Sequence, residues 1–144
     1  AVSQGMNLTI AHPPGYELDP DDMSTIARVA SQSGGSVSVS HKLDESIDGA
    51  DVVYVKSWGA ISHFGRPADE AALRSDKKDW RMTEARSHKL TDQGFVMHCL
   101  PVRRNIEIDD AVLDGPRAAV VDEAENRLHV QRALLLELIG ELSQ

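Results

Sequence analysis

Short apolar segments alternate with helix-like patterns along most of the chain. Five segments predict β-strands because they are short and either β-branched or alternating, and they span residues 6–11, 36–41, 51–56, 95–100 and 118–121. Helices are predicted where apolar residues recur three and four positions apart or form a short helical link, over residues 19–33, 43–49, 80–90 and 126–142. This alternation predicts a three-layer, Rossmann-like α/β domain with a mainly parallel sheet.

Two features of this pattern indicate where a ligand would bind. Residues 58–79 form a polar stretch with little periodicity, longer than an ordinary loop, which predicts a functional or ligand-covering segment. The segment 95–100 is nearly all apolar and is therefore predicted to be buried on both faces. Ligands of parallel sheets bind beyond the carboxyl ends of the strands, which selects residues 12–14, 56–59 and 98–104.

Composition narrows the class of protein. The 144 residues suffice for one domain, with 41% hydrophobic and 26% charged residues. A net charge of −8 argues against nucleic acid or a membrane surface as the main partner, and no apolar run approaches the ~20 residues of a membrane span. The first residues have neither an initiator Met nor signal-peptide features, and the single cysteine cannot form an internal disulfide. We therefore expect a cytoplasmic protein.

The segment 98–105 carries the most chemistry. An imidazole, a thiol and two guanidinium groups (His98, Cys99, Arg103 and Arg104) follow a predicted strand, and Pro101 restricts the turn. Arginine forks suit planar carboxylate, phosphate or carbamoyl oxygens. Composition alone leaves a second interpretation open, in which a buried structural cysteine lies beside a surface basic pair.

The order of three motifs adds a resemblance. The sequence His-Cys-Leu-Pro at 98–101, with Arg-Arg-Asn at 103–105, resembles the transcarbamylase signature, and it follows Lys-Ser-Trp-Gly at 56–59. The third motif, Asp-Glu-Ala-Glu-Asn-Arg-Leu-His at 122–129, occurs in family order. The chain is most similar to the acylornithine branch of that family, and the Lys-Ser-Trp-Gly segment favours the N-acetylornithine enzymes over the N-succinylornithine enzymes.

The resemblance implies a reaction that needs neither a metal nor an organic cofactor. The δ-amine of N-acetylornithine would attack the carbonyl carbon of carbamoyl phosphate, giving N-acetylcitrulline and phosphate. Cys99 and the Leu100 carbonyl would lie at the reacting centre, and Cys99 need not become a covalent nucleophile because the amine attacks. Arg127 would reach carbamoyl phosphate, although it could instead be a surface residue of the last helix.

The remaining site residues follow from the same resemblance. Lys56 would bind the α-carboxylate of the amino acid, or be an ordinary surface lysine. Trp58 would wall the pocket, or belong to the core. Arg103 would face the substrate, and Glu107 would pair with Lys56 or a nearby arginine, or lie in a solvent-facing turn. His98 lies beside the substrate in this interpretation, but it and His129 are expected to be structural hydrogen-bonding residues.

The resemblance covers the second, amino-acid-binding domain of a transcarbamylase, over residues 1–144. The family's Ser-Thr-Arg-Thr-type phosphate loop does not occur in the sequence, so we expect the carbamoyl-phosphate domain to be absent and the isolated chain to be inactive. The resemblance also implies that a central strand, between 6–11 and 51–56, is missing, which would leave both as sheet edges. It further implies a homotrimer, a chain knot, and a final helix whose leucines form an apolar patch.

Three alternatives remain beside the N-acetylornithine interpretation. The chain could be the equivalent domain of an N-succinylornithine or an ornithine carbamoyltransferase, or a non-catalytic folding or assembly fragment. A nucleotide-binding oxidoreductase domain fits the α/β pattern, but no G-x-G-x-x-G turn follows a predicted strand.

Overall fold

The computed structural model describes residues 1–141 and divides them into two compact units. One unit contains Ala1–Asp48 and Trp58–Arg81, and the other contains Gly49–Ser57 and the chain from Met82 onward. The elements of the first unit are η1 (Val2–Gln4), β1 (Asn7–Ala11), α1 (Pro20–Ser33), β2 (Ser36–Ser40), α2 (Leu43–Ile47), η2 (Ile61–His63) and α3 (Pro67–Ser75). Those of the second unit are β3 (Val52–Tyr54), α4 (Glu84–Ser87), β4 (Phe95–Met97), α5 (Asp110–Leu113) and α6 (Val120–Glu141).

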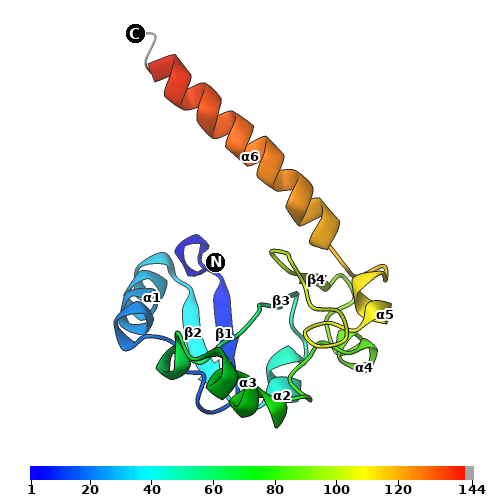
Figure 1. Ribbon diagram of the computed structural model, residues 1–144. Coiled ribbons are helices and arrows are strands. Elements are labelled where there is room, and N and C mark those ends of the chain that lie inside the picture. Colours follow the sequence, from blue (N-terminus) through cyan, green and yellow to red (C-terminus); the bar gives the residue numbers. More distant parts are fainter. Residues whose placement is uncertain (142–144) are drawn as a thin grey trace. The chain divides into compact units, whose positions relative to one another are not determined.

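The first unit is built on the parallel pair of β1 and β2, with Leu8 opposite Val37 (Figure 1). The helix α1 connects the two strands and begins where the sequence predicts. Asp19 caps it by accepting a hydrogen bond from the Asp21 amide at 2.8 Å, and Pro20 takes the first helical position. Gly34 ends it with φ 81°, a left-handed conformation that glycine adopts without strain. The predicted strand–helix–strand order is confirmed here.

The second unit contains the parallel pair of β3 and β4, in which Val53 lies opposite Val96. Both strands are shorter than the predicted segments, and β4 is not buried on both faces, since Phe95 is 37% exposed while Val96 is fully buried. The fifth predicted strand, at 118–121, is wrong. Only Ala118 forms a bridge, to Val96, and α6 begins at Val120. Val120 and Val121, the β-branched pair that suggested a strand, therefore belong to the helix.

Two further predictions need correction. The stretch 58–79 is not structureless, because it contains η2 and the nine-residue helix α3. Pro67 at the start of α3 and the acidic pair of Asp69 and Glu70 in its first turn are ordinary helix-start signals that the scarcity of apolar residues concealed. Conversely, the helix expected over 80–90 is reduced to α4, which Thr83 caps by accepting a hydrogen bond from the Arg86 amide.

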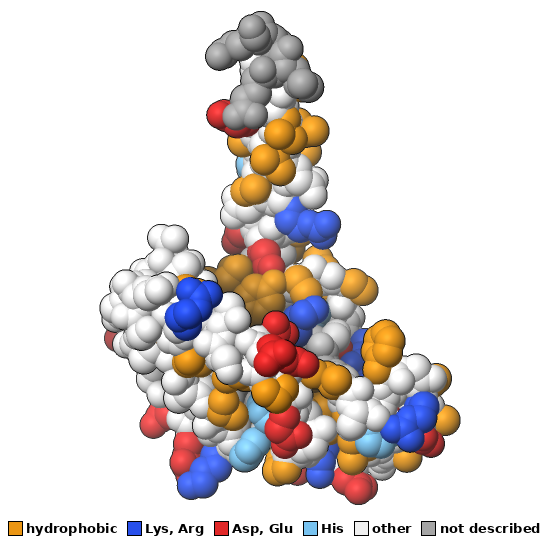
Figure 2. Space-filling view, turned by 90° about the vertical axis from the view of Figure 1, so that its left-hand side faces the viewer, with side chains coloured by type: hydrophobic (Ala, Val, Ile, Leu, Met, Phe, Trp, Pro, Cys, Tyr) orange, Lys and Arg blue, Asp and Glu red, His pale blue; other side chains and the backbone are white. Residues whose placement is uncertain are grey.

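The helix α6 begins six residues earlier than predicted and runs for 22 residues. Val120 is buried, but from Val121 onward its large apolar side chains are exposed, as Figure 2 shows for one face. They are Val121, Leu128, Val130, Leu134, Leu135, Leu136, Leu138 and Ile139. The predicted apolar patch is thereby confirmed, while Leu142, counted with it, lies outside the described residues. No helix in the described part of the chain has the length and apolarity needed to cross a membrane.

The α/β class with parallel strands is confirmed, and the four strands of residues 1–141 form two two-stranded sheets. Within this described part, β1 pairs only with β2, and β3 pairs only with β4. The core of the second unit lies beneath the β3–β4 pair, where Val96 and Ile108 are fully buried. Two polar side chains, His98 and Glu107, are buried with them. The interior of this unit therefore contains an ionisable pair directly after a strand end.

Candidate functional site

The parallel pairing of β3 and β4 brings two of the selected strand ends together. Tyr54 lies opposite Met97, and the Val55 amide donates to the Met97 carbonyl at 2.9 Å. The residues that follow therefore leave the sheet side by side. Lys56 comes from one strand and Cys99 from the other, and the Lys56 Nζ donates to the Cys99 Sγ at 3.4 Å. Two of the three segments that the strand-end rule selected therefore meet at one edge of this sheet.

Glu107 holds the segments around this edge in place. Its side chain has no exposed area, and its two oxygens accept four hydrogen bonds. Oε1 accepts from the Ser57 hydroxyl and from the Arg103 Nε, both at 2.7 Å. Oε2 accepts from the His98 Nε2 at 3.1 Å and from the Arg103 amide at 3.0 Å. A buried carboxylate with every lone-pair direction used is a structural anchor for the three segments it joins.

The pKa of Glu107 reflects this environment. Burial acts to raise it, but the hydrogen bonds from the Arg103 amide, the Ser57 hydroxyl and the Arg103 side chain, with the Arg103 charge, outweigh burial and lower the pKa to about 2. Glu107 is therefore ionised throughout the neutral range. The expected ion pair is formed with Arg103, while Lys56 donates to Cys99.

His98 connects Glu107 to the turn at Leu100 through its two ring nitrogens. The Leu100 amide donates to the His98 Nδ1 at 3.0 Å, so Nδ1 is an acceptor and the ring proton lies on Nε2, which donates to Glu107. Leu100 has φ 48°, in the left-handed region that costs a non-glycine residue about 1–3 kcal/mol. Because such conformations persist only where their surroundings enforce them, the His98–Glu107 pair specifies where the Leu100 carbonyl lies.

The two arginines of the motif have different surroundings. Arg103 is 41% exposed in its side chain and uses its Nε on Glu107, and the described residues offer no hydrogen bond to its Nη atoms. Arg104 pairs through its Nη atoms with Asp110 of α5 and with Asp114, at 2.7 Å each. Arg104 is therefore occupied by the carboxylates around α5, while Arg103 has its terminal groups available for a ligand.

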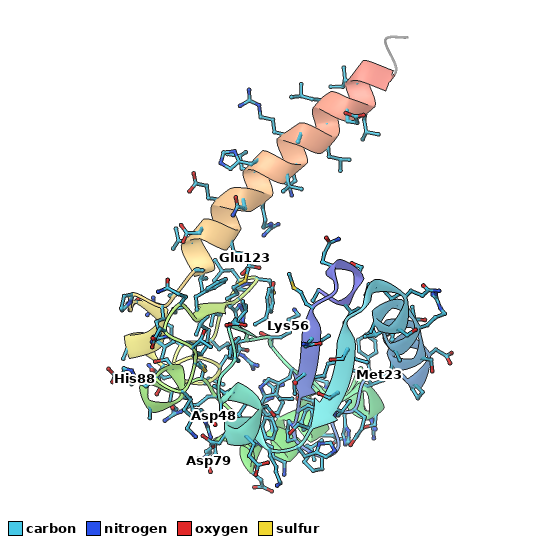
Figure 3. The ribbon with its side chains drawn as sticks, turned by 180° about the vertical axis from the view of Figure 1, so that it is seen from behind. Met23, Asp48, Lys56, Asp79, His88 and Glu123 are labelled. Carbon is cyan, nitrogen blue, oxygen red and sulfur yellow. The ribbon has the colours of Figure 1, made fainter. Side chains whose placement is uncertain are left out.

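A second carboxylate, which sequence reasoning did not select, touches the same strand ends. Glu123 lies in the first turn of α6 (Figure 3) and accepts from the Tyr54 hydroxyl at 2.6 Å and from the His98 amide at 3.1 Å. The hydrogen bond to Glu123 and burial raise the pKa of Tyr54 above its ordinary value, with a contribution from Cys99. Two sequence signals could have indicated this contact. Tyr54 lies two positions before Lys56 in the predicted strand 51–56, and Glu123 lies about one helical turn before Arg127.

Arg127 is exposed on α6, and within residues 1–141 its side chain has no hydrogen bond or ion pair. It borders an open hollow of about 290 Å³ with Glu123, Asn126, Val130 and Gln131. All of these residues belong to one helix, so the hollow is a shallow surface rather than an enclosed site. His129 is exposed and lies 3.6 Å from Glu125, a surface contact only.

Trp58 belongs to the first unit, whereas Lys56 and Cys99 belong to the second. Its ring meets the buried Tyr16 ring edge to face at 4.7 Å between centroids, and the Arg74 guanidinium lies 5.7 Å above it. Arg74 in turn pairs with Glu70 one helical turn earlier. These contacts favour the core-like interpretation of Trp58, as the residue that fixes the segment after Gly59 to its own unit.

The arrangement is suited to binding and positioning. It offers an ammonium group, a thiol, a strained backbone carbonyl and a half-exposed guanidinium within one unit. In the described part of the chain, no group of three or more His, Cys, Asp or Glu side chains could hold a metal ion. Polar groups of this kind can hold an amine, a carboxylate and a carbonyl oxygen in fixed relation.

Comparison with known proteins gives consistent matches. The model of the family described as aspartate/ornithine carbamoyltransferase, Asp/Orn binding domain, matches residues 1–138. The N-acetylornithine carbamoyltransferase of Xanthomonas campestris pv. campestris is 45% identical over 142 residues, which is 98% of this chain and 42% of that protein. The ornithine carbamoyltransferase of Parafrankia sp. is 37% identical over 137 residues, or 95% of this chain and 42% of that protein.

Solved structures agree with these relatives. A crystal structure of acetylornithine transcarbamylase complexed with acetylcitrulline has a TM-score of 0.86 and 43% identity, covering 93% of this chain and 40% of that chain. A mutant of N-acetyl-L-ornithine transcarbamylase, complexed with carbamyl phosphate and N-succinyl-L-norvaline, gives the same values. The chain thus spans about two fifths of the length of the relatives it matches.

Proposed function

The chain belongs to the aspartate/ornithine carbamoyltransferase family, matching its Asp/Orn-binding domain, and on that premise we propose that it is the amino-acid-binding part of an N-acetylornithine carbamoyltransferase. The proposed reaction transfers the carbamoyl group of carbamoyl phosphate to the δ-amine of N-acetyl-L-ornithine. The products are N-acetyl-L-citrulline and phosphate, as a step of arginine biosynthesis. The higher identity to N-acetylornithine enzymes, 45% against 37% for the ornithine enzyme, favours the acetylated substrate.

The observation that carries the proposal is the meeting of Lys56 and Cys99 at neighbouring strand ends, 3.4 Å apart. Cys99 and the Leu100 carbonyl would hold the substrate amine and the carbamoyl NH₂ group at the reacting centre. The α-carboxylate of the bound amino acid lies several bonds away from that amine. Lys56 would therefore turn from the thiol to the carboxylate on binding, which its flexible four-carbon stem allows.

Catalysis of this kind depends on the alignment of two bound reactants and on stabilisation of charge in the tetrahedral transition state. The exposed guanidinium of Arg127 is proposed to reach carbamoyl phosphate, with no partner in residues 1–141 to compete for it. The free Nη groups of Arg103 would face the amino acid. Cys99 serves as a hydrogen-bonding group, because the nucleophile is the substrate amine.

Three residues first assigned to substrate binding are better explained as supports. The polar atoms of His98 and Glu107 are used within the chain, so we propose that they position the Cys99–Leu100 turn without touching the substrate. The contacts of Trp58 with Tyr16 and Arg74 support a role in anchoring its segment. A pocket-wall role for Trp58 would require its free ring face to meet the amino acid.

The proposal includes a second component that binds carbamoyl phosphate. The relatives are more than twice as long as this chain, and the phosphate loop of the family does not occur in the sequence. We propose that the exposed leucines of α6 pack against that component, and that a homotrimer completes the site in the cytoplasm. We also propose that a further strand lies between β1 and β3 in the complete protein, and that the chain after Arg103 forms a knot.

A chimera tests the proposed reaction. Residues 1–144 are joined to the carbamoyl-phosphate-binding part of the Xanthomonas campestris relative, and acylated and free citrulline are measured with each amino acid. We expect turnover with N-acetylornithine, at least about tenfold less with ornithine, and none with the 144-residue chain alone. Turnover by the chain alone, or a chimera that binds carbamoyl phosphate and carbamoylates ornithine best, would overturn the assignment. A folded chimera without turnover would favour a non-catalytic assembly fragment.

A further inference from the structure

Two carboxylates hold opposite sides of His98, and only one of them was expected to matter. Glu107 accepts from the ring of His98, whereas Glu123 accepts from its backbone amide at 3.1 Å. The amide of His98 comes directly after β4 and one residue before Cys99. Glu123 therefore fixes the peptide plane that leads into the Cys99–Leu100 turn.

The other oxygen of Glu123 reaches the neighbouring strand. Its Oε1 accepts from the Tyr54 hydroxyl at 2.6 Å, a short bond to the last residue of β3. Lys56 follows Tyr54 by two positions, just beyond the end of β3, and its Nζ donates to the Cys99 Sγ. One carboxylate thus connects the end of β3, two residues before Lys56, to His98, one residue before Cys99.

Glu123 also belongs to α6, and this gives the connection a third component. The Glu123 amide bonds to the Ala119 carbonyl at 2.9 Å, and the Ala119 amide bonds to the Val96 carbonyl of β4 at 2.8 Å. Arg127 lies four residues after Glu123, on the same face of the helix, and both border the hollow described above. The start of the helix that carries Arg127 is consequently tied to both strand ends.

From these contacts we infer that Glu123 is a positioning residue of the site, which sets the Cys99 turn, the Lys56 strand and the Arg127 helix relative to one another through Tyr54 and the His98 amide. The inference rests on the proposed function for what the site does. The contacts themselves do not depend on the identity of the substrate.

The test uses the only cysteine of the chain as a reporter. The rate of alkylation of Cys99 by iodoacetamide is measured for the 144-residue chain at pH 7. A half-buried thiol reacts faster when its turn opens locally. Because one net hydrogen bond corresponds to about fivefold in an opening equilibrium, we expect Glu123→Gln and Tyr54→Phe to raise the rate about fivefold, and Glu123→Ala more. The matched control is Glu137→Gln, an exposed carboxylate on the same helix, with a rate within about twofold of the parent.

Two readouts separate positioning from a general loss of stability. Tyr54→Phe combined with Glu123→Ala should react no faster than Glu123→Ala alone, because both remove the same contact. The excess rate should also be independent of urea below the unfolding transition, as local opening is. A Glu123→Gln rate within twofold of the parent, multiplicative effects in the double variant, or an excess rate that rises with urea from zero would each overturn the inference.

A final arm keeps this result distinct from the proposed function. N-acetylornithine is added at saturating concentration, and we expect it to slow alkylation of Cys99 in the unmodified chain. If it does not protect the thiol, the substrate assignment fails, while the rates of the Glu123 variants still decide the positioning role. If Glu123→Ala does not fold, Glu123→Gln and Tyr54→Phe retain the shapes of the native side chains and carry the test.

Discussion

The polar residues around Glu107 have their hydrogen-bond partners within the chain, whereas the apolar side chains of α6 are largely uncovered. Around Glu107 every oxygen of a fully buried carboxylate has its donors within the chain, and His98 uses both of its ring nitrogens. From Val121 onward the large apolar side chains of α6 stay exposed, from 49% for Leu138 to 78% for Val121. The hydrogen-bonding groups of Glu107 and His98 are thus satisfied by neighbouring residues, whereas nothing within residues 1–141 covers the apolar side chains of α6.

This difference indicates which substitutions should destabilise the fold and which should not. A satisfied polar network in the interior is expensive to disturb, because each lost partner leaves a buried group unpaired. The exposed leucines contribute less to the stability of the chain than buried ones, since less of their surface is removed from water. Substitutions around Glu107 should therefore lower the free energy of unfolding much more than substitutions of the exposed leucines.

The largest effect is expected at the centre of the network. Glu107→Ala leaves the buried His98 ring and the half-exposed Arg103 side chain without their acceptor, and it should lower the free energy of unfolding by about 3 kcal/mol. Urea unfolding followed by circular dichroism measures the change, with the exposed Glu137→Ala as the control, expected within about 0.5 kcal/mol. A Glu107→Ala variant as stable as the control would show that the network adds nothing to the fold.

Truncation of a buried and of an exposed apolar side chain compares the two regions directly. Val96 is fully buried in β4, so Val96→Ala should cost about 2–3 kcal/mol by the cavity it leaves. Leu135 is 58% exposed, so Leu135→Ala on α6 should change the free energy of unfolding by less than about 0.5 kcal/mol in the isolated chain. The same urea experiment compares them, and equal costs would mean that α6 is covered in solution.

The pH dependence of stability tests the charge on Glu107. Its folded pKa of about 2 lies below the ordinary glutamate pKa of 4.5, so the folded state binds fewer protons than the unfolded state between these values. The stabilisation is complete above pH 4.5 and is lost as the pH falls through 2, with about 2 kcal/mol gone by pH 3. Comparison of the unmodified chain with Glu107→Gln at pH 3 and pH 7 isolates this part. A difference between the two proteins that does not shrink on acidification would contradict it.

A smaller effect is expected at the edge of the network. Ser57→Ala removes one of the four donors to Glu107 and leaves three, so the free energy of unfolding should fall by about 1 kcal/mol. Ser62→Ala, at an exposed serine outside the network, is the control, measured in the same urea titration. A cost at Ser57 as large as that of Glu107→Ala would mean that the four hydrogen bonds form and break as one.

Much of this arrangement is readable from the sequence. The capping signals of Asp19 and Gly34 predicted α1 because they act locally. The rule for strand ends selected the segments that contain Lys56 and Cys99 as places where a ligand could bind. The pairing of β3 with β4, which brings these two residues together, was not predicted and comes from the structure.

The remaining features depend on contacts between distant segments. The stretch 118–121 looks like a strand by composition, yet Val120 begins α6 after a single bridge at Ala118. Tyr54 and Glu123 are 69 positions apart, and no spacing rule joins them. The role of Glu107 depends on its complete burial, which a sequence of mixed charged residues around 103–110 does not indicate. Tertiary packing decides each of these points.

The most direct measurement of the central claim is a calorimetric titration of the 144-residue chain with N-acetyl-L-ornithine at pH 7. We predict saturable binding at one site, with a dissociation constant of about 1 mM or tighter. Lys56→Met should weaken this binding at least about tenfold by removing the carboxylate partner, while Glu137→Gln should leave it unchanged. No saturable heat from a folded chain, or equal binding by Lys56→Met, would contradict the assignment of these strand ends as the amino-acid site.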